Sequence, residues 1–168
     1  VRRLVGSEMC IRDRWYSNKL SLQIDFMKTN KIFFSFTSYD IINNNGKPTN
    51  KVISVPKKIS HSQYLKNTII GCLTVIIDKK NIRIPLMKDI RTSHDMLLWL
   101  DILKNEEYAF GLNQVLASYR LSSNSNTKNK LFAAIDVWRV YRDYERLNLI
   151  DSFYNFMHYA FNALKKRI

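Results

Sequence analysis

A carboxylate at the start of an apolar helix is the feature of this 168-residue sequence best suited to chemistry. Asp95 closely follows Ser93, whose hydroxyl can cap a helix by accepting a bond from a free backbone N–H group. The apolar residues around and beyond it recur at helical spacing, which predicts a buried face made of Met96, Trp99, Leu100 and Leu103. In the first helical turn the helix dipole favours the ionised form of a carboxylate. Such a carboxylate can act as a general base, and the alternative is an acid that only caps the helix and is solvated.

Four segments in a fixed order carry a resemblance to a known family. His94-Asp95, followed by Leu98-Trp99-Leu100, resembles the motif that carries the catalytic base in family 2 glycosyltransferases of the GT-A fold. Residues 69–74 resemble the strand that floors the acceptor pocket, and residues 108–120 resemble the pair of strands after the base helix. Residues 123–130 resemble the loop and helix start that close over the donor diphosphate. The likeness runs from about Trp15 to the C-terminus and is closest to bacterial enzymes of surface-polysaccharide synthesis, including teichuronic-acid-type transferases.

The resemblance implies a site of three kinds of residue. Asp95 is implied as the base, although His94 stands where the family often has an acidic residue. The acceptor-binding residues implied are Gly71, Cys72, Arg91, His94 and Trp99, and the donor-diphosphate-binding residues are Arg120, Ser123 and Ser125. The reaction implied is transfer of a sugar, with inversion, from a nucleotide sugar to a glycan or lipid-linked acceptor.

Other interpretations of these residues stay open on the sequence alone. Gly71 can be a packing glycine, and Cys72 is expected to be a small buried residue without a lowered pKa. Arg91 can be simply solvated at the end of an irregular basic loop, residues 81–91. Residues 121–127 can be a solvated linker whose last residues cap the next helix.

From the resemblance we expect that the half of a GT-A enzyme that binds the nucleotide is not part of this sequence. In the family, a Rossmann-like half carries an Asp-x-Asp motif for a divalent metal, Mn²⁺ or Mg²⁺, and no such motif occurs here. The first 14 residues resemble translated adapter sequence and contain no initiator Met, so we expect an artefactual tag at 1–14. We then expect a partial GT-A catalytic domain at 15–127, the acceptor-binding half, and an amphipathic helical tail at 128–168. A fragment of this kind should be inactive.

Composition excludes several classes of protein. With 46% hydrophobic and 12% aromatic residues, the chain can bury a core and is not disordered. Two cysteines give no disulfide framework and suit a reducing compartment, so we expect a cytoplasmic protein. The three histidines, His61, His94 and His158, have no metal-ligand spacing.

The net charge of +13 points to an anionic partner. Without the first 14 residues, which hold four Arg against one Glu and one Asp, the charge is +11. Eight Lys and two Arg lie between Asn44 and Arg91, against only Asp78 and Asp89. This stretch has one aromatic residue and no nucleic-acid-binding motif, so we expect no nucleic acid as partner. The excess reflects either biased coding composition or attraction to a membrane face or a phosphate-bearing acceptor. The alternative function is a non-catalytic basic module that binds an anionic membrane or nucleic acid.

The coarse pattern predicts an α/β fold. A helix capped by Ser17 should run to about Lys28 with Leu20, Ile24 and Met27 on its buried face. Strands are predicted at 32–39, with Phe34 and Phe36 on one buried side, and at 51–55. The Asn-rich turn at 43–46 joins these strands as a hairpin. Ser60 should begin a short helix, and the apolar run 69–77 suits a central strand buried on both faces.

The last 40 residues predict two amphipathic helices. The first carries a mostly apolar stripe at helical spacing, with Asp143 and Glu145 expected on the exposed side; the stripe is Leu131, Ala134, Ile135, Trp138, Tyr141 and Arg142. The second carries another stripe and ends in the basic cluster 165–167; its members are Phe153, Phe156, Met157, Ala160, Phe161 and Leu164. The second stripe either packs on its own domain or lies at a membrane interface. In the latter case the protein is peripheral on the inner face of the plasma membrane.

Overall fold

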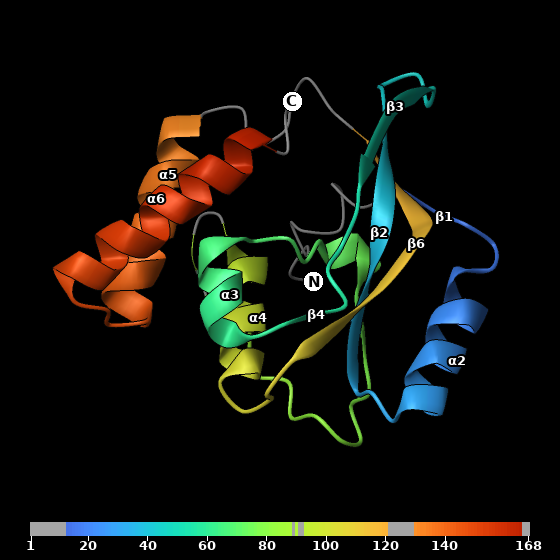
Figure 1. The fold of residues 1–168 in the computed structure, drawn as a ribbon, viewed down its shortest axis with the longest axis horizontal. Coiled ribbons are helices and arrows are strands. Elements are labelled where there is room, and N and C mark those ends of the chain that lie inside the picture. Colours follow the sequence, from blue (N-terminus) through green and yellow to red (C-terminus); the bar gives the residue numbers. More distant parts are fainter. Residues whose placement is uncertain (1–12, 89, 91–92, 121–129, 166–168) are drawn as a thin grey trace, which may run out of the picture. The chain divides into compact units, whose positions relative to one another are not determined.

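The fold is α/β, as predicted: a mixed six-stranded sheet with flanking helices (Figure 1). The computed structural model describes residues 13–88, 90, 93–120 and 130–165. The chain forms two compact units that interleave along the sequence. The first contains residues 1–58, 71–78 and 110–125, and the second contains residues 59–70, 79–109 and 126–168.

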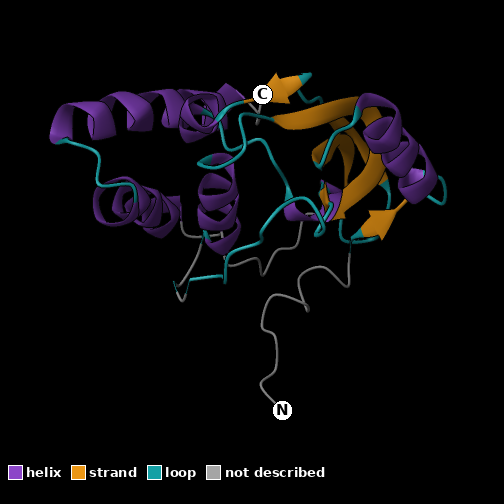
Figure 2. Cartoon of the chain, turned by 90° about the horizontal axis from the view of Figure 1, so that it is seen from below, coloured by secondary structure: helices purple, strands orange, loops and turns teal. Residues whose placement is uncertain are grey.

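The sheet is built around one parallel pair of strands, β2 and β6, which are drawn in orange in Figure 2. β1 pairs antiparallel with β6, β3 and β5 pair antiparallel with β2, and β4 pairs with β6. The strands are β1 (Arg14–Trp15), β2 (Phe34–Ile42), β3 (Pro48–Ile53), β4 (Lys58–Ile59), β5 (Ile76–Ile77) and β6 (Ala109–Arg120). The predicted β2–β3 hairpin is therefore confirmed.

The hairpin turn forms as its sequence predicts. Gly46 has φ 77°, a left-handed conformation that glycine adopts without strain. The Asn43 side-chain oxygen accepts bonds from the backbone N–H groups of Asn45 at 2.9 Å and Lys47 at 3.0 Å. An Asn side chain that mimics a backbone turn in this way fixes the hairpin locally.

Strand β2 is buried on both faces, whereas the alternation of its residues predicted one buried side. Phe34 and Phe36 are buried as expected, but Ser35, Thr37 and Ser38 are buried as well. The Ser38 hydroxyl accepts a bond from the Val55 backbone N–H at 3.1 Å and donates to Asn113 at 2.7 Å. Internal hydrogen bonds of this kind allow the polar side chains on one face of a strand to be buried.

Helix α2 (Lys19–Asn30) lies beside the sheet with a different face inward than predicted (Figure 1). Its buried residues are Lys19, Gln23 and Met27, and Leu20 and Ile24 are exposed. Gln23 explains why this face of α2 is buried, because its amide nitrogen donates to the Ser35 hydroxyl and to the Thr74 carbonyl, both at 2.9 Å. One polar side chain thus joins helix, sheet and the 71–74 turn. Ser17 does not cap the helix: the N-cap position is Asn18, without a side-chain bond.

Two strand predictions are wrong in detail. The apolar run 69–77 is not a central strand, since it forms the 3-10 turn η1 (Cys72–Thr74) and the two-residue strand β5. The segment 108–120 is one long strand, β6, rather than a pair of strands. Its pairing with β2 shifts register between Thr37 and Tyr39, so β6 has a local irregularity where a break between two strands was expected.

The second unit is helical. Its elements are α3 (His61–Lys66), α4 (His94–Leu103), α5 (Lys130–Arg139), the π-helix η3 (Val140–Tyr144) and α6 (Leu149–Lys165). The Ser60 start of α3 is confirmed, with a capping box in which Ser60 and Gln63 bond reciprocally. The buried Tyr141 hydroxyl donates to the Leu65 carbonyl at 2.6 Å and ties the π-helix to α3. On α5 and the π-helix, Val137 and Val140 are buried and the predicted stripe residue Ile135 is exposed.

The Glu145 side chain is buried, contrary to the prediction that it faces solvent. Its carboxylate lies 3.0 Å from His61 Nε2 and 2.7 Å from Lys104 Nζ. Burial favours the neutral acid, but the hydrogen bonds and charges of His61 and Lys104 outweigh it and lower the pKa of Glu145. The carboxylate therefore joins the start of α3, the end of α4 and the residue after the π-helix.

We predict that Gly111→Ala destabilises the first unit while Gly71→Ala does not. A Cβ at Gly111 would overlap the Pro56 carbonyl oxygen, whereas a Cβ at Gly71 would meet its nearest atom, in the Tyr39 ring, at 3.7 Å. Overpacking of this kind costs about 1–3 kcal/mol, and a tolerated Gly→Ala change is neutral or stabilising by about 0.4–1 kcal/mol. Urea denaturation checks both values, and equal stability of the two variants would contradict the packing described.

We predict that Glu145→Gln lowers the free energy of unfolding by about 1–3 kcal/mol at pH 7. The substitution removes a buried negative charge and leaves His61 and Lys104 without their anionic partner. Since the pKa of Glu145 is lowered on folding, its contribution is present above the unfolded pKa and disappears as the pH falls through the folded pKa. The difference from wild type, measured by urea denaturation, should therefore shrink towards pH 3.

The matched control is Asp143→Asn, an exposed carboxylate two residues away, which should change stability by less than about 0.5 kcal/mol. Equal losses in the two variants, or a Glu145→Gln loss that does not change with pH, would rule out the ion-pair account.

Candidate functional site

Helix α4 carries the candidate base as the sequence predicts. It begins at His94, and its predicted buried face is confirmed by Met96, Trp99, Leu100 and Leu103. The predicted cap is wrong: Ser93 is left-handed, with φ 64°, and its side chain makes no cap bond. The turn is closed instead by the backbone, where Leu97 N–H donates to the Ser93 carbonyl at 3.2 Å. A left-handed residue at the N-cap of the helix, two positions before the candidate base, is consistent with a functional position.

Asp95 lies half-buried in the first turn of α4. Burial raises the pKa of its carboxyl, and the charge of neighbouring His94 opposes this only in part. The helix-dipole argument predicted the opposite direction, and it fails because loss of solvation is the larger effect here. A carboxyl with a raised pKa is a stronger base once ionised, which suits proton abstraction.

The loop before Asp95 is fastened to the same helix. Residues 81–88 form no helix or strand, as predicted, and Lys88 Nζ lies 3.0 Å from Asp101 Oδ2. The His94 ring nitrogen Nδ1 lies 3.3 Å from the Lys88 carbonyl oxygen. Lys88 also lies over the Tyr144 ring, 5.3 Å from its centroid. These contacts position His94, and Arg91, the loop's candidate acceptor residue, falls outside the described residues.

Trp99 is buried, with 4% of its surface exposed. It lies one helical turn beyond Asp95 and belongs to the core that holds α4. Its predicted role as an acceptor-binding residue remains a prediction. In this position it supports the base helix from the core side.

Gly71 and Cys72 form the start of the η1 turn in the first unit. The Gly71 carbonyl accepts bonds from the Thr74 backbone N–H at 2.9 Å and the Thr74 hydroxyl at 2.7 Å. Cys72 is exposed, which corrects the expectation that it is buried. The Trp15 indole N–H donates to the Leu73 carbonyl at 2.8 Å and fixes the other side of this turn.

Arg120, at the end of β6, is engaged by the hairpin turn. Its Nη1 donates to the carbonyl oxygens of Asn44 at 2.7 Å and Asn43 at 3.4 Å. This arrangement fixes the guanidinium group at the hairpin, and the predicted contact with a donor diphosphate stays a prediction. Its proposed partners Ser123 and Ser125 lie outside the described residues.

The candidate residues thus fall into two groups. His94, Asp95 and Trp99 share α4 in the second unit, and Gly71, Cys72 and Arg120 belong to the first. Within the described parts of the chain, no three His, Cys, Asp or Glu side chains lie together in a way that could hold a metal ion.

A buried lysine in the first unit was missed by the sequence reasoning. Lys19 is fully buried, donates to Gln23 Oε1 at 2.8 Å and lies 4.3 Å from the centroid of the Trp15 ring. Burial lowers the pKa of Lys19 to about 8. The signal that could have found it is the i, i+4, i+8 spacing of Lys19, Gln23 and Met27, which marks one face of the helix.

Comparison with curated proteins identifies relatives over most of the chain, although no family model matches it. It is 44% identical, over 93% of its length, to a Bacillus subtilis protein named as a teichuronic acid biosynthesis glycosyltransferase. It is 36% identical, over 92% of its length, to an Escherichia coli protein, WfgD, named as a UDP-Glc:α-D-GlcNAc-diphosphoundecaprenol β-1,3-glucosyltransferase. A second E. coli protein of the same description, WfaP, is 37% identical over 70% of the chain.

The matched region is only part of each relative. The chain spans 62% of the Bacillus protein's length, 60% of WfgD and 46% of WfaP, which fits a fragment. The predicted resemblance is confirmed by these relatives, and they give no support to the alternative of a non-catalytic basic module. Similarity over nearly its whole length makes this chain a homologue of glycosyltransferases that synthesise bacterial surface polysaccharides.

Proposed function

We propose that this chain is the acceptor-side part of an inverting, family 2 glycosyltransferase that uses a nucleotide sugar. The observation that carries the proposal is Asp95, a half-buried carboxyl with a raised pKa in the first turn of α4. Its position matches the base position of the motif that the sequence resembles. The relatives' names add that proteins of this kind transfer sugars.

In the proposed mechanism Asp95 accepts the proton of an acceptor hydroxyl. The acceptor oxygen then bonds to the anomeric carbon from the face opposite the diphosphate, and the bond from that carbon to the diphosphate oxygen breaks. The nucleoside diphosphate leaves with the electron pair of that bond. A base fixed by a helix on a packed core favours such a step, because the carboxylate needs no reorganisation to meet the hydroxyl.

Other residues are proposed to position the substrates. His94, Arg91, Gly71 and Cys72 are proposed to contact the acceptor, with Trp99 supporting α4 from the core. Arg120, Ser123 and Ser125 are proposed to contact the donor diphosphate. The described residues offer no metal cluster, so a divalent metal of the complete transferase would require ligands other than these.

The acceptor is proposed to be a glycan or a lipid-linked sugar. WfgD and WfaP are named for an acceptor on diphosphoundecaprenol. For this chain, an acceptor on a lipid would place the reaction at a membrane surface, and peripheral membrane contact through α6 would bring the protein there. The same proposal places the protein on the cytoplasmic side.

We predict that Asp95→Asn lowers kcat by about 10²–10⁴-fold and leaves donor affinity nearly unchanged. The test uses a chimera in which the N-terminal part of the Bacillus subtilis relative precedes Trp15. Because burial raises the pKa of Asp95, the parent chimera should lose kcat/KM at low pH through a pKa above the usual value of about 3.9. The Asp95→Asn variant should lack this acid limb.

The matched control is Glu107→Gln, an exposed carboxylate shortly after the same helix, which should retain kcat within about twofold. Near-normal turnover by Asp95→Asn would end the proposal for the base.

We predict that the 168-residue chain alone binds no nucleotide sugar at micromolar concentrations. The sequence contains neither an Asp-x-Asp motif nor a glycine-rich phosphate loop. Calorimetry with UDP- and GDP-sugars in the presence of Mn²⁺ should therefore give no binding heat. A metal-dependent micromolar Kd would show that the donor site has been assigned to the wrong part of the protein.

A further inference from the structure

Helix α6 turns an apolar face away from the unit to which it belongs. Six large apolar side chains on it are 53–81% exposed, and we call them the outer face: Leu149, Ile150, Phe153, Met157, Phe161 and Leu164. At about 100° per residue they occupy one contiguous third of the helix surface. Phe156 and Ala160, which the sequence placed in the same stripe, are only half-exposed; by helical position Ala160 lies within the outer face and Phe156 lies just beyond its edge.

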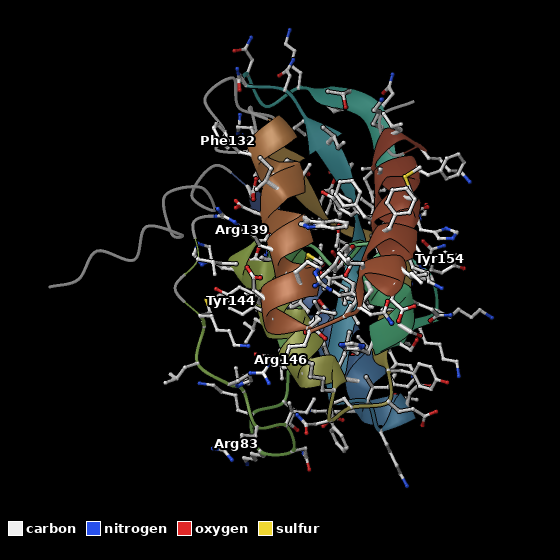
Figure 3. The ribbon with its side chains drawn as sticks, turned by 90° about the vertical axis from the view of Figure 1, so that its left-hand side faces the viewer. Arg83, Phe132, Arg139, Tyr144, Arg146 and Tyr154 are labelled. Carbon is white, nitrogen blue, oxygen red and sulfur yellow. The ribbon has the colours of Figure 1, made fainter. Side chains whose placement is uncertain are left out.

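The opposite side of α6 is polar and fixed to the unit. Ser152 and Asn155 are buried and donate to backbone carbonyls of the preceding turn, at 2.7 and 2.8 Å. Asn162 Nδ2 donates to the Lys66 carbonyl at 3.0 Å and so ties α6 to the end of α3. The Phe156 ring contacts the Trp138 ring of α5 edge-on, with centroids 5.7 Å apart. Figure 3 shows α5 and α6 side by side, with Phe132 and Arg139 on α5 and Tyr154 on α6.

These contacts fix the rotation of the helix about its axis. Turning the outer face inward would break the Asn162–Lys66 bond and the Phe156–Trp138 contact, and would expose Ser152 and Asn155. Amphipathic helices normally bury the apolar side. The apolar face is thus held outward by one hydrogen bond to the end of α3 and one ring contact with α5, and an exposed apolar face of this size marks a binding surface.

The charges around the outer face identify its partner. Asp151 is the single acidic residue in α6, and by helical position it lies outside the outer face and accepts a bond from Asn148. Lys165 ends the helix, and the sequence continues with Lys166 and Arg167. Lys66 lies 4.7 Å from the ring centroid of Tyr154, at the edge of the outer face. An apolar surface edged by cations and an interfacial tyrosine fits an anionic lipid surface.

We propose that α6 is an interfacial helix that docks on an anionic phospholipid surface through its outer face. The inference deepens the proposed function, on which it rests, because a lipid-linked acceptor is reached at the bilayer surface. The helix has 17 residues, about 25 Å at 1.5 Å per residue, and would lie in the plane of the interface. Among the described residues there is no helix with the length and apolarity needed to cross a bilayer.

A second copy of the chain fits the outer face less well. Parallel pairing of two α6 helices would bring their two basic ends together, and antiparallel pairing would place each Lys165 end near the partner's α6 start and the preceding Arg146. The outer face offers no carboxylate to either arrangement. Anionic headgroups satisfy these cations, whereas a second copy repeats them.

The test is co-sedimentation of the full 168-residue chain with phosphatidylglycerol-containing vesicles, compared with phosphatidylcholine vesicles. Phe153→Ser/Met157→Ser removes an exposed i, i+4 pair from the outer face and should weaken binding at least about tenfold. The matched control is Leu20→Ser/Ile24→Ser, an exposed i, i+4 pair on α2, which should bind within about twofold of the parent. Circular dichroism should show unchanged helix content in both variants.

A separate variant tests the contribution of the basic residues at the end of the helix. Replacing Lys165, Lys166 and Arg167 by Gln should weaken binding to anionic vesicles by roughly 10²-fold if all three engage. Binding of the parent should also weaken at 1 M salt, where the Debye length is about 3 Å.

Three results would overturn the inference. The first is a folded parent chain that never pellets with anionic vesicles. The second is a Phe153→Ser/Met157→Ser variant that binds as well as the parent. The third is a dimer in sedimentation velocity that this variant dissociates, without vesicle binding by the parent. The experiment needs neither donor nor acceptor, so failure of sugar transfer in the chimera would count against the proposed function and leave this result intact.

Discussion

The buried carboxylate of Glu145 is the interaction on which the geometry of the second unit depends. It meets His61 at the start of α3 and Lys104 just after α4, and Lys104 also pairs with Asp101. Asp101 in turn holds Lys88, whose carbonyl lies within reach of the His94 ring. A chain of charges therefore runs from the residue after the π-helix to the loop before Asp95. The Glu145 side chain is the buried member of this chain, whereas Lys104 and Lys88 are partly exposed, so the chain connects both ends of the helix that carries the candidate base and is anchored at Glu145.

In the same unit, a candidate residue can hold the helix of the proposed base in place without itself taking part in the reaction. Trp99 and its apolar neighbours make α4 rigid from the core side, and Asp95 emerges in the first turn with a raised pKa. On the outside, α6 keeps polar contacts inward and apolar side chains outward. The core that holds the proposed base and the outer face proposed to dock on lipid belong to the same unit, as an acceptor at a membrane surface would require.

Sequence reasoning predicted the elements with strong local signals. The Asn43–Gly46 turn, the helix start at Ser60 and the α4 periodicity each depend on residues close in the chain, and each is confirmed. The errors arise where residues distant in the sequence determine which side chains are buried. Gln23 bonds to Ser35 and Thr74, so α2 buries a polar face that no hydrophobic pattern indicates. Glu145 is buried because His61, far away in the sequence, supplies a partner. The direction of the Asp95 pKa shift likewise depends on tertiary burial rather than on the helix dipole.

The most direct test of the central claim isolates the chemical step at Asp95. In a single-turnover experiment with saturating donor and acceptor, the chimera with Asp95→Asn should bind both substrates but transfer the sugar at least about 100-fold more slowly than the parent. Its residual rate should not fall at low pH. A transfer rate equal to that of the parent, with the same acid limb, would contradict the assignment of Asp95 as the base.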